Sequence, residues 1–444
     1  MNNEVIIIGG GLAGCEAAFQ LSKRGIKVKL YDMKPVKFSP AHKSEDLAEI
    51  VCSNSFKSNL LTNACGLLKE ELRRLGSELI PIADQTAVPA GQALAVDRDE
   101  FSKIVTNKIN SDPNIELIRE EITQIPKDSN VIIATGPLTS EELSNSIQEL
   151  IGGDSLAFYD AAAPIIDKDS INFDIAFYGN RYEQERDLEE DVETWKTKLK
   201  AQEKSYINLP MNKEEYENFV NELINAENVV LHDFEKREIF EGCMPVEIMA
   251  KRGLDTLRFG PLKPVGFTDP RTGFRPYAVV QLRQDNKEAT LYNMVGFQTN
   301  LKFGEQKRVF SMIPGLENAS FEKYGVMHRN TFINSPKVLN NFYQMKNNPN
   351  IYFAGQITGV EGYVESISSG LVAGIDLAKQ LSDEERNGYS EDTIIGSLAN
   401  YISSEHDDFQ PMNANFGLLR PLPTKIRDKK LRYQKLAERA LESI

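Results

Sequence analysis

The chain has 444 residues, of which 41% are hydrophobic and 26% charged, so we expect a globular protein of about two or three domains. No stretch approaches the ~20 apolar residues of a membrane helix, and no charged-then-apolar leader is visible, so we expect a cytoplasmic protein. The net charge of −14 argues against a protein that coats nucleic acid non-specifically. The four cysteines form no CxxC pair, so we expect no metal site.

The N-terminal sequence is typical of a dinucleotide-binding βαβ unit. Residues 4–9 predict a buried strand, 12–24 a helix and 27–31 a second strand. The turn before the helix has a GxGxxG pattern, in which glycines permit a tight turn, the approach of a pyrophosphate and close helix packing. Asp32 ends the second strand, where a carboxylate can bind ribose hydroxyls. The alternative is a glycine-rich turn without a ligand. The expected cofactor-binding residues are Gly9, Gly10, Gly11, Leu12, Ala13, Gly14 and Asp32.

Two later segments favour FAD over NAD. VIIATG at 131–136 and IYFAGQ at 351–356 resemble the strand–turn elements with which flavoproteins close over FAD. They add Thr135, Gly136, Gly355 and Gln356 to the expected cofactor site. A helix after 355 would direct backbone N–H groups at the cofactor. The alternative is that both segments are ordinary buried strands.

The middle of the chain predicts a region inserted into this domain. Residues 67–80 predict an amphipathic helix that is weakened at Gly76, and the charged stretch 183–226 predicts an exposed helical segment. Strands are predicted at 276–284 and 289–298. The stretch 258–310 mixes Arg and Lys with Phe and Tyr, a mixture that can stack bases and hold phosphates. Composition alone favours a solvated loop surface there.

Two cysteines are candidate reactive thiols. Cys52 in VCSNS and Cys243 in EGCMP lie in polar, turn-rich contexts, whereas Cys15 lies on an apolar helix and suits a buried structural role. Basic residues nearby in sequence would favour a thiolate if they are close in space. These are Lys57, Lys251, Arg252 and Lys263. For both cysteines a structural role is the alternative.

Taken together, the motifs resemble one family, the folate- and FAD-dependent RNA uracil-5-methyltransferases (TrmFO). The flavoprotein GidA is a more distant relative that shares the FAD domain. The resemblance implies an α/β fold: a Rossmann-like FAD-binding domain of the GidA-related type, at 1–165 plus 330–444, with an inserted α+β substrate domain at 166–329. The matching stretches span nearly the whole chain: GGGLAGCEAA, PAHKSEDLAEIVCSNS, NACGLLKEELRRL, ALAVDRDEFS, ATGPLTS, FYDAAAPI, FEGCMPVE, FGPLKPVG, DPRTGFRPYAVVQLRQDN, YNMVGFQT, GVMHRNTFINSP, FAGQITGVEGYVES and MNANFGLL.

The resemblance also implies the chemistry. NADH or NADPH reduces FAD, and 5,10-methylenetetrahydrofolate supplies a carbon that passes by way of the flavin to C5 of a uridine in structured RNA. Cys243 matches the family's nucleophile, and Cys52 matches a second cysteine near the flavin. Tyr363 matches an aromatic residue beside the flavin, with Gly362 and Glu365 as further cofactor-binding residues.

Some positions depart from the family pattern. Asp32 stands where Glu is more usual, Lys43 replaces a second His, and Cys65 replaces a Val. The segment 299–303 (TNLKF) lacks a His and a Trp. These departures leave the RNA target open. The T-loop uridine of tRNA is expected, and a 23S ribosomal RNA uridine, as in the branch RlmFO, is the alternative. More remote alternatives are an NAD(P)H–flavin oxidoreductase for a small molecule and a non-enzymatic RNA-binding scaffold.

Overall fold

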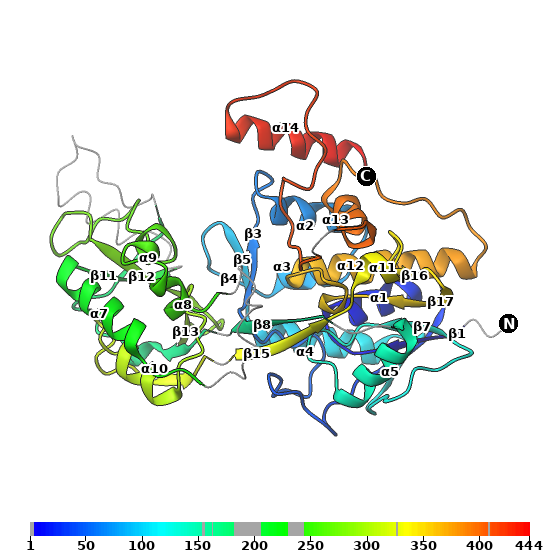
Figure 1. Ribbon diagram of the computed structural model, residues 1–444, viewed down its shortest axis with the longest axis horizontal. Coiled ribbons are helices and arrows are strands. Elements are labelled where there is room, and N and C mark those ends of the chain that lie inside the picture. The colour runs from blue at the N-terminus through cyan, green and yellow to red at the C-terminus, as the bar shows by residue number, and fades with distance from the viewer. Residues whose placement is uncertain are drawn as a thin grey trace.

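The computed structural model describes residues 4–152, 156–161, 163–181, 206–229, 244–325, 327–406 and 409–444. For 156–161 and 327–329 only the backbone is described. Cys243 lies outside the described residues. Figure 1 shows two bodies: one combines the N-terminal (blue and cyan) and C-terminal (orange and red) parts of the chain, and the other is formed by the middle (green).

The first body is built on a six-stranded sheet with the order β16-β17-β7-β1-β2-β6. All its pairings are parallel except that of β16 with β17. β1 has a nearly continuous apolar sequence because both faces of a parallel sheet are covered. The strands are β1 (Glu4–Ile8), β2 (Lys27–Tyr31), β6 (Ile115–Ile118), β7 (Asn130–Ile133), β16 (Gln344–Met345) and β17 (Asn348–Phe353).

Helices α1 (Leu12–Ser22) and α12 (Tyr363–Leu381) pack closely against each other. A Cβ at Gly370 would lie 2.2 Å from the carbonyl oxygen of Ala13, so glycine is needed for this approach. The contact joins segments that are far apart in sequence (Figure 1). The remaining helices of this body are α2 (Ala64–Arg74), α3 (Leu79–Gln85), α4 (Arg98–Ser111), α5 (Glu141–Ile151), α11 (Ser335–Val338), α13 (Ile394–Ser403) and α14 (Lys429–Glu442).

The second body contains an antiparallel six-stranded sheet with the order β10-β11-β12-β13-β9-β14. It has a hydrophobic core of its own, with Ile207, Phe219 and Phe297 completely buried. The strands are β9 (Ile165–Asp167), β10 (Phe177–Tyr178), β11 (Tyr206–Met211), β12 (Ala278–Gln284), β13 (Leu291–Met294) and β14 (Phe321–Lys323). The helices are α7 (Lys213–Asn225), α8 (Val246–Lys251), α9 (Thr256–Phe259) and α10 (Phe303–Phe310).

Two smaller sheets lie between the bodies in Figure 1. β8 (Leu156–Ala161) pairs with β15 (Met327–Phe332), so the chain enters and leaves the second body through adjacent strands. β3 (Ser55–Ser58), β5 (Ala93–Val96) and β4 (Ala87–Val88) form the other. The buried residues of the first core come from 5–147 and 332–440, and those of the second from 163–319. The exact domain boundaries stay a prediction. No helix among the described residues is long and apolar enough to cross a membrane.

Two expected helices are confirmed only in part. Of the stretch 183–226, residues 183–205 lie outside the described residues and α7 (Lys213–Asn225) confirms the helical expectation for its end. Residues 206–211 instead form β11, because pairing with β10 and β12 on either side outweighs the local helical character. The helix expected at 67–80 is confirmed up to Arg74, where α2 ends, and the chain becomes helical again at Leu79, where α3 begins. Gly76 between them has a φ of 80°, a left-handed conformation that ends a helix.

Candidate functional site

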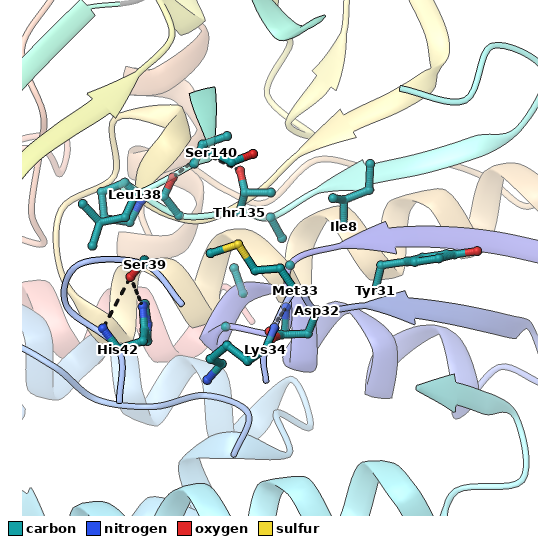
Figure 2. Close-up of a pocket in the computed structure, with 18 of the residues that line it drawn as sticks. Ile8, Tyr31, Asp32, Met33, Lys34, Ser39, His42, Thr135, Leu138 and Ser140 are labelled. Atoms are coloured by element: carbon teal, nitrogen blue, oxygen red, sulfur yellow. Dashed lines mark hydrogen bonds between the residues drawn. The ribbon is translucent and has the colours of Figure 1, made fainter. Parts of the chain in front are cut away.

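A pocket opens at the carboxyl ends of β1, β2 and β7, where an open parallel sheet binds its ligands. Figure 2 shows Asp32 and Lys34, which follow β2, on one side, and Thr135 and Ser140 on another. Most of the expected cofactor residues line this pocket. They are Gly9, Gly10, Gly11, Leu12, Ala13, Asp32, Thr135, Gly136 and Gln356, together with Tyr363.

The glycine turn has the geometry that a dinucleotide requires. Gly9 has a φ of 109°, and a Cβ on Gly14 would lie 1.9 Å from the carbonyl oxygen of Gly9. A Cβ on Gly11, in contrast, would meet no protein atom within 4 Å. Gly11 therefore borders open space at the N-terminus of α1, where backbone N–H groups and the helix dipole favour a phosphate.

Asp32 is held beside this turn. Its Oδ2 accepts a hydrogen bond from the backbone N of Gly10 at 3.1 Å, and its Oδ1 accepts one from the backbone N of Lys34 at 2.9 Å. Arg119 lies 3.8 Å from Oδ1. The carboxylate is thus fixed next to the phosphate position, as a ribose-binding acid must be. The glycine turn and Asp32 together fit the ADP half of FAD.

The later strand–turn elements close the pocket in a different way from the one expected. The helix after 355 does not begin there: a 3-10 turn (Gln356–Thr358) intervenes, and α12 begins at Tyr363. Gly355 donates its N–H to Ser369 Oγ at 2.7 Å and does not line the pocket. The first turn of α12, through Tyr363 and Ser366, supplies the lining instead.

Glu365 is completely buried in the same first turn, where the helix dipole favours an anion. Its Oε1 accepts a hydrogen bond from the N of Ala414 at 2.9 Å and forms an ion pair with Lys57 Nζ at 3.4 Å. Burial, the largest single influence, lowers the pKa of Lys57, but the nearby negative charges, of which Glu365 is the strongest, together outweigh burial and the pKa is raised. A Cβ on Gly362 would lie 2.2 Å from Glu365 Oε2. Gly362 and Glu365 lie beside the pocket rather than on its surface, and their cofactor role stays a prediction.

The segment that carries Cys52 is attached to Tyr363. The phenol oxygen of Tyr363 accepts hydrogen bonds from the backbone N of Cys52 at 3.0 Å and of Ser53 at 3.1 Å. The Tyr363 ring also packs against Phe56, with ring centroids 5.7 Å apart. Burial, followed by the nearby Cys52, raises the pKa of Tyr363 despite the opposing charge of Arg98. A candidate thiol thus lies at the edge of the flavin pocket, next to a phenol that stays protonated.

Two arginines, Arg283, which is buried, and Arg98, which is mostly buried, hold this segment from the other side, and the sequence analysis did not single them out. Arg98 donates to the carbonyl oxygen of Ile50 at 2.8 Å and forms an ion pair with Asp285 at 2.9 Å. Arg283, on β12, donates to Ser53 Oγ at 2.6 Å and Asn54 Oδ1 at 3.0 Å. The Cys52 segment is therefore fixed by residues from both bodies. No local pattern identifies these arginines, because their partners are distant in sequence.

The two other described cysteines are not poised to react. Burial raises the pKa of the Cys65 thiol to about 12 and also raises that of Cys15. Both are nearly inaccessible, which agrees with a structural role for Cys15. Lys57, expected to favour a thiolate, is paired with Glu365. The position of Cys243 lies outside the described residues, so its role stays a prediction.

Further pocket residues come from the loop after β2. Lys34, Ser39, His42 and Glu49 line the pocket, and His42 Nδ1 lies 2.5 Å from Ser39 Oγ. The only sequence signal for them is that they follow the ribose acid. Asn300, one of the positions that depart from the family pattern, is buried in the second body, where its backbone N donates to Glu247.

The proteins to which this chain is similar agree with the pocket described above. Residues 4–385 match the family described as Glucose inhibited division protein A. A protein of Acetivibrio thermocellus named methylenetetrahydrofolate–tRNA-(uracil-5-)-methyltransferase TrmFO is 58% identical over 100% of this chain and 98% of its own. The protein of that name from Bacillus subtilis is 56% identical, with coverage of 100% and 98%.

The structural comparison bears on the fold alone. The crystal structure of Aquifex aeolicus GidA (form I) superimposes with a TM-score of 0.70 at 16% identity, over 99% of this chain and 75% of that one. The expected α/β fold of the GidA-related type is confirmed. Because the chain is 56–58% identical to the two named relatives over its full length, it belongs to the TrmFO family.

Proposed function

We propose that this protein methylates C5 of a uridine in tRNA, with FAD as cofactor, 5,10-methylenetetrahydrofolate as carbon donor and NADH or NADPH as reductant. The observation that carries the proposal is the attachment of the Cys52 segment to Tyr363 at the edge of the flavin pocket. The relatives' names supply the substrate class. A plain flavin oxidoreductase has no need of a cysteine fixed at this place.

The residues around the pocket bind and orient FAD. Asp32 accepts the ribose hydroxyls, and the open backbone at Gly11 and the N-terminus of α1 receive the pyrophosphate. Tyr363 and Gln356 lie at the other wall of the pocket. When bound, FAD supplies both the reducing electrons and the carrier of the folate carbon.

The uracil ring needs activation because its C5 is a poor nucleophile. We assign this step to Cys243, whose thiolate adds to C6 and sends the electrons of the C5–C6 double bond towards O4. Nucleophilic C5 of the resulting enolate attacks the methylene carbon, and loss of the C5 proton with cleavage of the bond between that carbon and its carrier leaves an exocyclic methylene on the ring. The hydride that converts this methylene into the methyl group would come from reduced FAD, when bound, and expulsion of the Cys243 thiolate restores the C5–C6 double bond. Cys52 protects the reactive centre beside the flavin, where Tyr363 keeps its backbone in place.

The experiment is an assay of purified, FAD-loaded protein with isotope-labelled methylenetetrahydrofolate, each nicotinamide in turn, and unmodified tRNA or 23S ribosomal RNA. The proposal expects labelled 5-methyluridine in tRNA, and none with Cys243→Ala. If the label appeared in ribosomal RNA alone, the proposed tRNA target would be wrong. Flavin reduction without label in either RNA would favour the small-molecule oxidoreductase, and a protein that cannot be loaded with FAD would favour the scaffold.

A further inference from the structure

Phe259, at the end of α9, is unusually exposed for a large apolar side chain. It is 80% accessible, whereas Leu257 in the same short helix is completely buried in the second core. The backbone under it is well anchored: the N of Phe259 donates to the carbonyl oxygen of Asp255 at 3.2 Å. Arg258 packs over the Tyr277 ring at 3.6 Å. An aromatic ring is therefore exposed on an anchored backbone and does not pack in the core.

This ring borders a shallow hollow on the second body, on the side where α8 and α9 lie in Figure 1. Met244 is part of the hollow, and it directly follows Cys243 in the chain. The hollow therefore begins at the residue next to the proposed nucleophile. Its other lining residues are Met249, Arg252, Gly253, Asp255, Thr256 and Gly260.

The charge of the chain segment that carries the hollow suits a polyanion. Residues 244–277 contain six Lys or Arg against three Asp or Glu, although acids outnumber bases in the whole chain by 65 to 51. Each of the three acids already has a partner. Asp255 pairs with Arg258, Asp269 pairs with Arg271, and Glu247 is buried and accepts from Thr299. Lys251, Lys263 and Arg275 lie on the same segment, and their positive charge attracts phosphates.

We propose that Phe259 is a stacking platform for an unstacked base of the RNA, next to the uridine that is methylated. The inference rests on the proposed function. A uridine packed in folded RNA must be turned out of its stack before it can react. The reacting base must enter the flavin site, so the exposed ring at the hollow's rim receives a neighbouring base. Sequence-tolerant stacking on an aromatic ring compensates for the stacking lost within the RNA.

The first test compares tRNA binding by Phe259→Ala, Phe259→Trp and wild type, using FAD-loaded protein and an unmodified tRNA transcript. Phe259→Ala should raise the Kd for tRNA about tenfold, and Phe259→Trp should restore it. The matched control is Phe173→Ala, which removes a 41% exposed ring that lies between Asp169 and Asp174 in sequence. This control should bind tRNA like wild type.

A second readout is specific for stacking. The chain has one tryptophan, so the emission of the Phe259→Trp indole can be isolated by subtracting wild type. Saturating tRNA should quench it. The stacking role of Phe259 would be wrong if Phe259→Ala bound tRNA with wild-type affinity. It would also be wrong if the indole emission of Phe259→Trp did not change when tRNA was bound. If wild type binds tRNA and the indole is quenched but no 5-methyluridine forms, the proposed function fails and the platform stands.

Discussion

The phenol oxygen of Tyr363 lies 3.0 Å from the backbone nitrogen of Cys52, although the two residues are 311 positions apart. The contact joins the first turn of α12, which lines the flavin pocket, to the segment that carries a candidate thiol. Because its raised pKa keeps the phenol protonated, the oxygen remains a neutral acceptor for Cys52 and Ser53. The position of Tyr363 in the pocket and the position of the Cys52 backbone therefore depend on each other.

Replacement of Tyr363 by Phe tests this coupling. Tyr363→Phe keeps the ring contact with Phe56 but leaves two backbone N–H groups without their acceptor. An unsatisfied buried donor costs about 1–3 kcal/mol, so the Cys52 segment should shift and methylation should slow at least about tenfold. FAD should stay bound, as judged by visible absorbance after gel filtration. A variant that methylates tRNA at the wild-type rate would show that the contact has no catalytic role.

Two glycines of the nucleotide turn should respond differently to the same change. Gly11→Ala adds a methyl group to open space, so the apoprotein should keep its Tm while FAD affinity falls. Gly14→Ala forces a contact with the carbonyl oxygen of Gly9 and should lower stability by about 1–3 kcal/mol. Calorimetry of the apoproteins and flavin titration separate the two effects. Equal loss of Tm in both variants would argue against an open ligand space at Gly11.

The cysteines should differ in reactivity. Alkylation with iodoacetamide at pH 8 should leave Cys15 and Cys65 unmodified in the native protein, because both thiols are buried and have raised pKa values. Mass spectrometry of peptides from the native and the unfolded protein gives the comparison. Cys65→Val should methylate tRNA at the wild-type rate. Rapid native labelling of Cys65 would contradict its assignment as a packing residue.

Glu71 should make stability depend on pH. Burial raises its pKa from 4.5 to about 7, against hydrogen bonds from the N of Ile394 and of Ile395 that lower it. Between these two values the folded state binds more protons than the unfolded state, so the free energy of unfolding falls as pH rises. The total loss of stability is about 3 kcal/mol by pH 8.

The control for this prediction is Glu71→Gln, which cannot titrate. The Tm of wild type minus that of Glu71→Gln should decrease from pH 5 to pH 8. A difference that is constant across this range would show that Glu71 ionises in the folded protein at its ordinary pKa.

Local sequence was sufficient for part of the site. Strand, turn, helix and acid follow one another within thirty residues from Glu4, so spacing alone predicted the cradle of Gly11 and Asp32. The fold class followed from the same unit and from the family resemblance. Cys52 was identified from its polar surroundings, although its contact with Tyr363 was not.

Contacts across long stretches of chain could not be predicted in this way. Arg283 reaches Ser53 and Asn54 only because the second body folds back against the first, and nothing near it in sequence marks this role. The sequence around β11 predicted a helix. Its place in the sheet depends on pairing with β12, some seventy residues later, which a local pattern does not contain. The strand–glycine pattern at 351–355 ends before Tyr363, so it could not predict where α12 begins. Glu365, in the first turn of α12, accepts a hydrogen bond from the N of Ala414, which lies much later in the chain.

The most direct measurement is a map of 5-methyluridine in total RNA from cells with and without this protein. The account predicts that deletion removes the T-loop 5-methyluridine of tRNA, and that the wild-type gene, but not one encoding Cys243→Ala, restores it. An unchanged map, or loss confined to 23S ribosomal RNA, would contradict it.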